Sequence, residues 1–322
     1  MRAAYAESLD AENPLAGLVV GDRPEPKAEP GWSVVRVKAV SLNHHDLWTL
    51  RGVGISEDRL PMILGCDAAG IDTATGDEVV VHSVISGPGW TGDETLDPQR
   101  SLLSERHQGS LAELVAVPSA NLIRKPAELS FAEAACLPTA WLTAYRMLFV
   151  NSGLRPGQTV LVQGATGGVA SACILLARTA GLRVWATART EEKQAVALKL
   201  GAHEAFESGA RLPERVDAVL ETVGAATWSH SLKSLRPGGR LVISGATSGA
   251  MPPAELNRIF FLQLQVIGST MGTRAELADL LRLLVSTGLR PPVDRTLPLD
   301  RVADGLAAME SGSLVGKIVI EP

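Results

Sequence analysis

Strand and helix patterns alternate through the second half of the chain, and this alternation limits the fold more than any other feature. Short runs rich in β-branched residues occur at 158–164, 183–188, 216–224 and 238–245. Helical stretches separate them, and the last one, 274–288, is strongly amphipathic. Strands that alternate with helices of about 10–15 residues build a parallel sheet with crossover helices. The pattern therefore predicts a doubly wound α/β domain.

Several residues are placed to begin or end these helices. Ser130 and Thr190 stand immediately before helical stretches, where a hydroxyl oxygen can accept a hydrogen bond from a free backbone N–H group. Gly181, Gly201 and Gly288 follow helical stretches, where glycine tolerates the left-handed conformation that ends many helices. We expect two N-caps and three helix ends at these positions.

A glycine-rich turn joins the first strand of this region to its first helix, in the stretch VLVQGATGGVAS at 160–171. Such a turn lets the backbone approach a pyrophosphate, and the helix N-terminus offers unpaired N–H groups. The strict GxGxxG pattern is absent, and glycine-rich turns also occur without ligands. The strand–turn–helix context nevertheless favours dinucleotide binding. The residues that we expect to line the cofactor here are Ala165, Thr166, Gly167, Gly168 and Val169.

The end of the second strand indicates which dinucleotide is bound. NAD sites usually place Asp or Glu there for the ribose 2′-OH, whereas an Arg accommodates the 2′-phosphate of NADP. The strand at 183–188 ends without an acidic residue and is followed by Arg189 and, one turn later, Lys193. A guanidinium group suits a phosphate dianion. The pattern favours NADP(H), although both cations could also be solvated surface charges.

The first third of the chain is predicted to be β-rich. Apolar alternation marks 31–42 and 76–85, and proline and glycine punctuate the region. The segment 86–109 has little periodicity and is expected to be a long surface loop, which either covers a cleft or is only a connection. From about residue 291 the chain reads as strand, helix and final strand, and this tail can return to complete the first domain.

Composition excludes several classes of protein. The 322 residues suggest about two domains, and the net charge of −5 with no basic run makes nucleic acid an unlikely partner. No stretch of about 20 apolar residues can span a membrane, and no signal region is recognised at the start, so we expect a cytoplasmic protein. Cys66, Cys136 and Cys173 lack a CxxC pattern, which argues against disulfides and a cysteine-rich zinc lobe.

The stretch SLNHHDLW at 41–48 places two histidines beside an aspartate. Imidazole and carboxylate groups side by side occur at metal sites and at acid–base sites. The same residues can also simply end a strand, with the histidines satisfied by Asp46 or by solvent. These three readings stay open on the residues alone.

Ordered matches along nearly the whole chain resemble the medium-chain dehydrogenase/reductase superfamily. They include SLNHHDLW, LGCDAAG, GDEVVVHSV, VLVQGATGGVAS and GKIVI. The resemblance implies an α/β protein in which a Rossmann domain with a doubly wound parallel sheet is inserted into a GroES-like, β-rich catalytic domain. The expected bounds are 1–121 with 290–322 for the catalytic domain and 122–289 for the Rossmann NADP(H)-binding domain.

The zinc alcohol dehydrogenases of this superfamily bind a catalytic zinc ion at three positions. By resemblance, those positions here hold Asn43, Cys66 and Thr139. Only Cys66 is a good zinc ligand, because Zn²⁺ takes thiolate and imidazole donors. The resemblance therefore implies no metal, although His44 or His45 could pair with Cys66 and Asp67 in another geometry.

Without zinc, the chain is similar to the quinone oxidoreductase and enoyl reductase branch. The resemblance implies that NADPH delivers a hydride to a quinone or an α,β-unsaturated carbonyl. Many relatives have a tyrosine where this chain has Trp48, whose indole N–H can donate a hydrogen bond but not a proton. Asn43 is a candidate to orient the nicotinamide ribose or the carbonyl. His44 or His45 is a candidate proton donor.

The resemblance also places further cofactor contacts at strand ends. These contacts are Thr143, Val223, Ser244, Gly245, Ala246, Ser269, Thr270, Met271 and Lys317. The resemblance does not decide whether Glu221, at the end of a strand, contacts the cofactor or only a donor within the chain.

The apolar stretch 264–272 reads as an edge strand that family members pair across a two-fold axis, so a homodimer is expected. Two rival functions remain open, namely an alcohol or carbonyl dehydrogenase with an atypical metal site and an NADPH-binding sensor without turnover.

Overall fold

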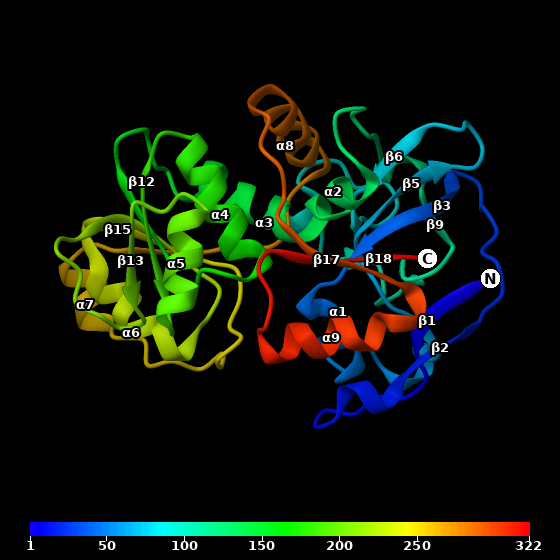
Figure 1. Cartoon of the computed structure of the whole chain (residues 1–322), viewed down its shortest axis with the longest axis horizontal. Coiled ribbons are helices and arrows are strands. Elements are labelled where there is room, and N and C mark those ends of the chain that lie inside the picture. Colours follow the sequence, from blue (N-terminus) through cyan, green and yellow to red (C-terminus); the bar gives the residue numbers. More distant parts are fainter. The chain divides into compact units, whose positions relative to one another are not determined.

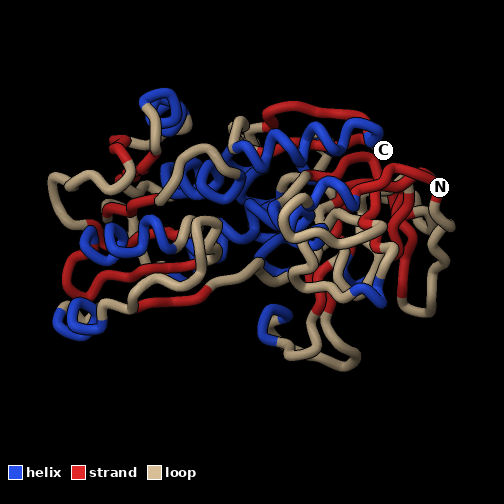
Figure 2. Tube along the Cα trace, turned by 90° about the horizontal axis from the view of Figure 1, so that it is seen from below, coloured by secondary structure: helices blue, strands red, loops and turns tan.

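The computed structural model describes all residues, 1–322, and divides into two compact units. The first unit combines Met1–Ala140 with Met271–Pro322, and the second is Trp141–Thr270. Both chain ends belong to the first unit and lie near each other in both views (Figures 1 and 2). The second unit is therefore inserted into the first, in the manner that the family resemblance implies.

The first unit is built on β3 (Trp32–Ser41), the central strand of its main sheet. This sheet has the order β10-β6-β5-β3-β18-β17, and β9 also pairs with β3. The bounds of the other strands in it are β5 (Ala68–Asp72), β6 (Glu78–Val81), β9 (Leu114–Pro118), β10 (Leu122–Arg124), β17 (Val293–Pro298) and β18 (Lys317–Glu321). Because β18 runs antiparallel to β3, with Ile320 opposite Val40, the C-terminal tail completes this unit as the sequence indicates.

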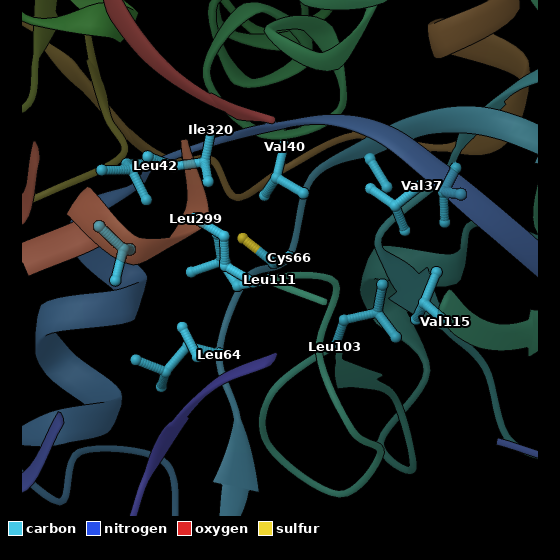
Figure 3. Close-up of a cluster of buried hydrophobic side chains, with 14 of the residues drawn as sticks. Val37, Val40, Leu42, Leu64, Cys66, Leu103, Leu111, Val115, Leu299 and Ile320 are labelled. Atoms are coloured by element: carbon cyan, nitrogen blue, oxygen red, sulfur yellow. The ribbon is translucent and has the colours of Figure 1, made fainter. Parts of the chain in front are cut away.

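Smaller sheets and the helices complete the first unit. The strands are β1 (Arg2–Ala6), β2 (Leu18–Asp22) and β4 (Met62–Ile63) in one sheet and β7 (Val84–Ile85) and β8 (Ser101–Leu102) in another. The α-helices are α1 (His44–Leu50), α2 (Phe131–Ala135), α8 (Arg274–Thr287) and α9 (Val302–Ser311). Val35, Val37 and Val40 of β3 lie in a core that also includes residues of the C-terminal tail. Figure 3 shows Val37, Val40 and Leu42 in this core with Leu299 and Ile320.

The boundaries between the units differ from the sequence prediction at both crossings. The units separate after 140 and after 270, rather than after 121 and after 289. Strand β10 pairs with β6, and Arg290 Nη2 donates to Glu128 O at 3.2 Å. His82 Nε2 lies 2.9 Å from Gly272 O. These bonds join residues far apart in sequence, so composition alone could not place the crossings.

The segment 86–109 is more closely packed than the predicted surface loop. The Asp97 carboxylate is buried and accepts from the N–H groups of Gly87 and Gln99, both at 2.7 Å. Leu103 is fully buried in the core of the first unit. The segment is therefore a long loop fixed at both ends, and its second half contributes to the core.

The second unit is a single parallel sheet of six strands in the order β13-β12-β11-β14-β15-β16. The strands are β11 (Thr159–Val162), β12 (Arg183–Ala188), β13 (Glu204–Glu207), β14 (Val216–Glu221), β15 (Leu235–Ile243) and β16 (Gln265–Gly268). The helices are α3 (Leu142–Tyr145), α4 (Gly168–Thr179), α5 (Glu191–Lys199), α6 (Ala225–Ser234) and α7 (Leu256–Phe261). Strand order reverses between β11 and β14, which confirms the doubly wound prediction and marks the edge where such sheets bind ligands.

The predicted helix ends are confirmed. Ser130 accepts a hydrogen bond from Glu133 N, and Thr190 accepts one from Lys193 N. Gly181, Gly201 and Gly288 have φ values of 75°, 110° and 71°. The longest helix, α8, has 14 residues, and no helix of the chain is long and apolar enough to cross a membrane.

The three cysteines are free and buried. Cys173 is one of the buried residues of α4. Burial raises the pKa of Cys136 and the pKa of Cys173 to about 12. These two thiols therefore stay protonated and act as small apolar side chains.

Candidate functional site

The stretch SLNHHDLW begins a helix, so the strand-end reading of its histidines is wrong. Strand β3 stops at Ser41, Asn43 has extended backbone at the N-cap, and α1 starts at His44. Asp46 accepts from Asn43 N at 2.8 Å and from Gly65 N at 3.0 Å. Burial raises the pKa of the Asp46 carboxyl, while the bond from the Asn43 N–H opposes that rise. Asp46 therefore fixes the start of α1, and no hydrogen bond joins it to a histidine.

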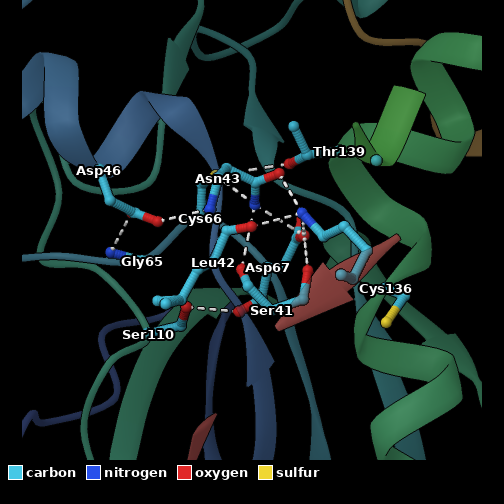
Figure 4. A network of polar contacts seen from close by, with 12 residues as sticks. Ser41, Leu42, Asn43, Asp46, Gly65, Cys66, Asp67, Ser110, Cys136 and Thr139 are labelled. Carbon is cyan, nitrogen blue, oxygen red and sulfur yellow. Dashed lines mark hydrogen bonds and ion pairs between the residues drawn. The ribbon is translucent and has the colours of Figure 1, made fainter. Parts of the chain in front are cut away.

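A buried polar cluster forms around Asn43, and Figure 4 shows its dashed contacts. The amide nitrogen of Asn43 donates to Ser41 O at 3.0 Å and to Asp67 Oδ2 at 2.8 Å. Its Oδ1 accepts from Lys317 Nζ at 2.6 Å. The same ammonium group donates to Leu42 O at 2.5 Å. Both N–H groups of Asn43 are therefore occupied, and only one lone pair of Oδ1 remains for a ligand.

The three positions at which related dehydrogenases bind zinc do come together. Cys66 Sγ lies 3.4 Å from Thr139 Oγ1 and 3.6 Å from Asn43 Nδ2. Burial, followed by the charges of Asp67 and Asp46, raises the pKa of the Cys66 thiol well above its usual value. A neutral thiol, an amide and a hydroxyl do not form the donor set that Zn²⁺ requires.

The alternative metal geometry is not observed either. No group of three or more His, Cys, Asp or Glu side chains is arranged to hold a metal ion. Neither His44 nor His45 is brought into such a group with Cys66 and Asp67. The residues present therefore do not fit a catalytic zinc ion.

His44 and Trp48 share one exposed face of α1. Their ring centroids are 6.3 Å apart, and 37% of Trp48 is exposed. Atoms packed around the His44 ring lower its pKa, and the charges of Lys317 and Arg51 lower it further, although the residue keeps an exposed surface. His44 is therefore neutral at pH 7. His45 is half-buried, and its Nε2 has no hydrogen-bond partner.

In the second unit, the residues predicted to contact the cofactor follow the carboxyl ends of parallel strands. Ala165–Val169 follow β11, Arg189 follows β12, Val223 follows β14, Ser244–Ala246 follow β15, and Ser269 with Thr270 follow β16. The sheet thus brings these residues to one edge. Lys193 lies in the first turn of α5 and Thr143 on α3, while Met271 and Lys317 belong to the first unit.

The glycine-rich turn leaves the N-terminus of α4 open. Gly164 has a φ of 79° and so adopts a conformation that favours glycine. Gly167, the N-cap, has an ordinary φ of −66° and provides no capping side chain. A Cβ built on Gly167 would meet no atom within 4 Å. The chain itself does not need glycine here, so the free space and the uncapped N–H groups fit a phosphate group.

A chain of buried hydrogen bonds supports this edge of the sheet. Gly164 N donates to Thr187 Oγ1 at 3.3 Å, and Thr187 Oγ1 donates to Gln163 Oε1 at 2.6 Å. Gln163 Nε2 donates to Ser231 Oγ at 2.9 Å, and Ser231 Oγ donates to Glu221 Oε2 at 2.6 Å. The bonds connect the ends of β11, β12 and β14. Sequence reasoning missed Gln163 and Thr187, and its only signal was a polar residue at the end of an apolar strand.

Glu221 closes this network and holds the turn after β14. Its Oε1 accepts from the N–H groups of Val223 at 2.7 Å and Gly224 at 3.1 Å. Its Oε2 also accepts from Thr227 Oγ1 at 2.8 Å. A Cβ on Gly224 would lie 2.6 Å from Gly249 O, so glycine is required there. Glu221 is therefore a positioning residue whose acceptors are already occupied.

Arg189 is exposed and has no partner within the chain. It follows Ala188, and Ala188 is opposite Glu207 of the neighbouring strand β13. Strand β13 was not predicted, so the acidic Glu207 was not considered as a ribose-binding residue. The end of β12 thus has an unpaired guanidinium group beside it and a carboxylate on the next strand.

Comparisons with known proteins agree with this architecture. The family described as alcohol dehydrogenase GroES-like domain matches residues 29–127, and the family described as zinc-binding dehydrogenase matches 168–286. A solved structure of an NAD-dependent alcohol dehydrogenase is 34% identical, with a TM-score of 0.92 over 100% of both chains. The chain belongs to the medium-chain dehydrogenase/reductase superfamily.

Curated relatives of the superfamily include reductases. An acryloyl-coenzyme A reductase of Sulfurisphaera tokodaii is 27% identical over 98% of this chain and 100% of its own length. A quinone oxidoreductase of Lama guanicoe is 28% identical over 89% of this chain and 88% of its own length. These two relatives and the solved alcohol dehydrogenase are named as oxidoreductases, which supports an enzyme.

Proposed function

We propose that the protein is an NADPH-dependent reductase that acts on a quinone or an α,β-unsaturated carbonyl without a catalytic metal ion. The observation that carries the proposal is the cluster at Asn43, Cys66 and Thr139, which occupies the family's zinc position with neutral donors. A conjugated acceptor spreads the incoming charge and needs less Lewis-acid assistance than a saturated carbonyl. The names of the two curated relatives, which act on an acryloyl thioester and on quinones, support this substrate class.

When bound, the nicotinamide supplies the hydride, and the residues of the chain bind and orient. The open N-terminus of α4 takes the pyrophosphate. The remaining lone pair of Asn43 Oδ1 can accept from a ribose hydroxyl, whereas its occupied N–H groups cannot donate to a substrate carbonyl. The structure thus favours the first of the two roles expected for Asn43.

Proton delivery is assigned to water rather than to a histidine. His44 has a lowered pKa and is neutral at pH 7, so it is a poor source of a proton. His45 is half-buried and lies in a different direction from the exposed face that carries His44 and Trp48. The indole N–H of Trp48 remains available as a hydrogen-bond donor to an oxyanion.

The preference for NADPH rests on Arg189, whose guanidinium group has no partner in the chain and suits the 2′-phosphate. NADH is the second candidate, because Glu207 is opposite Ala188 and could accept from a ribose 2′-OH. A 34% identical structure of an NAD-dependent alcohol dehydrogenase adds weight to that alternative. The two candidates differ in which of these side chains contacts the ribose.

The expected homodimer has a candidate surface in the second unit. Strand β16 is the edge of the six-stranded sheet, and 41% of Val266 is exposed on it. The preceding helix α7 exposes Leu256, Phe260 and Phe261. Edge strands and large apolar patches need cover. Light scattering should find a dimer, and Phe261→Asp should shift it to monomer; a monomeric wild-type chain would contradict this assignment.

The test of the function is anaerobic oxidation of NADPH, and separately of NADH, by metal-stripped protein against quinones, enones and saturated carbonyls. The proposal expects turnover with NADPH on conjugated acceptors and little turnover on saturated ones. Turnover that requires added Zn²⁺ and a saturated carbonyl would favour the dehydrogenase alternative. Tight NADPH binding without any turnover would favour the sensor.

A further inference from the structure

Lys317 is a buried cation that the proposed reduction does not require. Only 4% of the residue is exposed, and it is the first residue of β18. Its ammonium group donates to Leu42 O at 2.5 Å and to Asn43 Oδ1 at 2.6 Å. A buried ammonium group is costly unless it is paired with a compensating charge.

The compensating charge is Asp67, which is fully buried. Lys317 Nζ lies 3.9 Å from Asp67 Oδ2. The same oxygen accepts from Ser41 Oγ at 2.5 Å and from Asn43 Nδ2 at 2.8 Å, whereas Oδ1 has no hydrogen-bond partner. Asp67 is therefore only half satisfied by neutral groups, and the nearby ammonium supplies the opposite charge.

The geometry around Cys66 still has the spacing of a metal site. Two thiolates bound to one zinc ion at about 2.3 Å in a tetrahedron lie roughly 3.8 Å apart. The observed distances from Cys66 Sγ are 3.4 Å to Thr139 Oγ1 and 3.6 Å to Asn43 Nδ2. The backbone thus brings Asn43 and Thr139 each within ligand-to-ligand spacing of Cys66, while the donor atoms and the neighbouring cation differ from those of a zinc site.

We propose that the ammonium group of Lys317 is the resident cation of this site, where it balances Asp67, holds Asn43 by Oδ1 and repels a divalent metal ion. The charge of Asp67 is then neutralised within the chain, so a metal ion would bring an uncompensated positive charge next to an ammonium group. The inference does not rest on the reductase proposal, because binding and stability measurements test it without turnover.

The first test restores one thiolate and then removes the cation. Thr139→Cys places a second thiol beside Cys66 while Asn43 and Lys317 keep their contacts. Cobalt(II) is titrated into Thr139→Cys and into Thr139→Cys/Lys317→Met, and the thiolate-to-cobalt absorption band is followed. We expect Co²⁺ to bind at least about tenfold more tightly when Lys317 is replaced, a difference of about 1.4 kcal/mol. Adding Cys66→Ser should weaken the band, because only the thiolate at position 139 then remains.

Two results would overturn the inference in this test. One is equal Co²⁺ affinity with and without Lys317. The other is stoichiometric Co²⁺ binding by the wild-type chain, with a band that Cys66→Ser removes. The control Thr139→Cys/Lys317→Arg keeps the positive charge and should bind Co²⁺ as weakly as Thr139→Cys alone.

The second test asks whether the charge of Lys317 compensates the charge of Asp67, and it remains informative if Lys317→Met folds poorly. Lys317→Met leaves the Asp67 carboxylate buried without its cation, so the melting temperature should fall. Lys317→Met/Asp67→Asn removes both charges and should recover part of that loss. If the double variant is no more stable than Lys317→Met, Asp67 does not depend on Lys317 and the inference fails.

Discussion

Asp67 and Glu221 are both fully buried carboxylates beside candidate sites, yet they are held in opposite ways. Glu221, in the second unit, receives four hydrogen bonds from neutral donors, two on each oxygen. Asp67, in the first unit, has all its contacts on Oδ2, none on Oδ1, and an ammonium group 3.9 Å away. A carboxylate that neutral donors satisfy acts as a fixed acceptor, whereas one that a cation must balance couples two residues.

The same contrast separates the two candidate sites. At the sheet edge of the second unit, Gly167 leaves space and Arg189 has no partner, so this region is open to a ligand. In the first unit, the ammonium group of Lys317 donates to Asn43 Oδ1 at the family's zinc position, and the amide nitrogen of Asn43 is already bonded within the chain. The first arrangement leaves groups available to the proposed cofactor, whereas in the second we propose that a side chain takes the place of an external cation.

The largest expected effect is the loss of the buried cation. Lys317→Met should lower the stability of the first unit by about 3–5 kcal/mol, because it leaves a buried carboxylate without its partner. Native-state hydrogen exchange at β3 and β18 measures this opening separately from the second unit. A loss of stability below about 1 kcal/mol, which is typical of a surface ion pair, would show that Asp67 does not depend on its cation and so does not differ from Glu221 in this respect.

The next largest expected effect is on NADPH affinity and involves the exposed guanidinium group of Arg189. Arg189→Gln should weaken NADPH binding by roughly 10- to 100-fold, because hydrogen bonds to charged groups contribute about 1.5–3 kcal/mol. NADH binding and stability should stay unchanged, since Arg189 has no partner within the chain. Fluorescence titration of both nucleotides measures this. Glu207→Gln is the matched control, and a selective loss of NADH affinity in that variant would favour the NAD alternative.

Replacing Glu221, the carboxylate that neutral donors satisfy, should lower stability less than replacing Lys317. Glu221→Gln keeps an acceptor for the N–H groups of Val223 and Gly224, and the hydroxyls of Thr227 and Ser231 can rotate toward the new amide. We expect a loss of about 1–2 kcal/mol in the second unit, because charge-assisted bonds become neutral ones. Urea unfolding followed by exchange at β14 measures it. A loss as large as that of Lys317→Met would show that both carboxylates depend on charge in the same way.

The smallest effect is the part of the pH dependence of stability that arises from His82 in the first unit. His82 is 1% exposed, and burial lowers its pKa from the usual 6.5, against the bond to Gly272 O. The unfolded chain therefore binds the proton at higher pH than the folded chain. Stability should be complete above pH 6.5 and fall as the pH drops toward the lowered value. His82→Gln should flatten this slope in melting curves, and an unchanged slope would assign it to other groups.

The sequence predicted the fold well where the signal is local. Alternating strands and helices, N-caps at Ser130 and Thr190, and the return of the tail to the first domain are all confirmed, and the structure adds that the tail pairs with β3. Strand β13 was missed because its four residues, EAFE, contain no β-branched side chain. The compact units of the structure separate at residues other than the predicted bounds, because the pairing of β10 and the bonds around α8 are long-range contacts.

The position of the candidate residues in the fold was predictable, but their partners within the chain were not. The turn at 164–168 and Arg189 lie at the predicted edge of the sheet, while their contact with a cofactor stays a prediction. Lys317 was expected beside the cofactor, and the structure shows it bound to Asn43, 274 residues away in sequence. Only the antiparallel pairing of β18 with β3 brings these two residues together, so no local pattern could reveal the pair.

Enone-dependent NADPH oxidation, by protein whose bound metal is quantified in the same sample, is the most direct test of metal-free reduction. We expect turnover in chelator-treated protein with substoichiometric metal and no stimulation by Zn²⁺ or Co²⁺, because Lys317 already provides the cation of the site. Activity that rises in proportion to bound metal, and vanishes on its removal, would contradict both the metal-free reduction and the role given to Lys317.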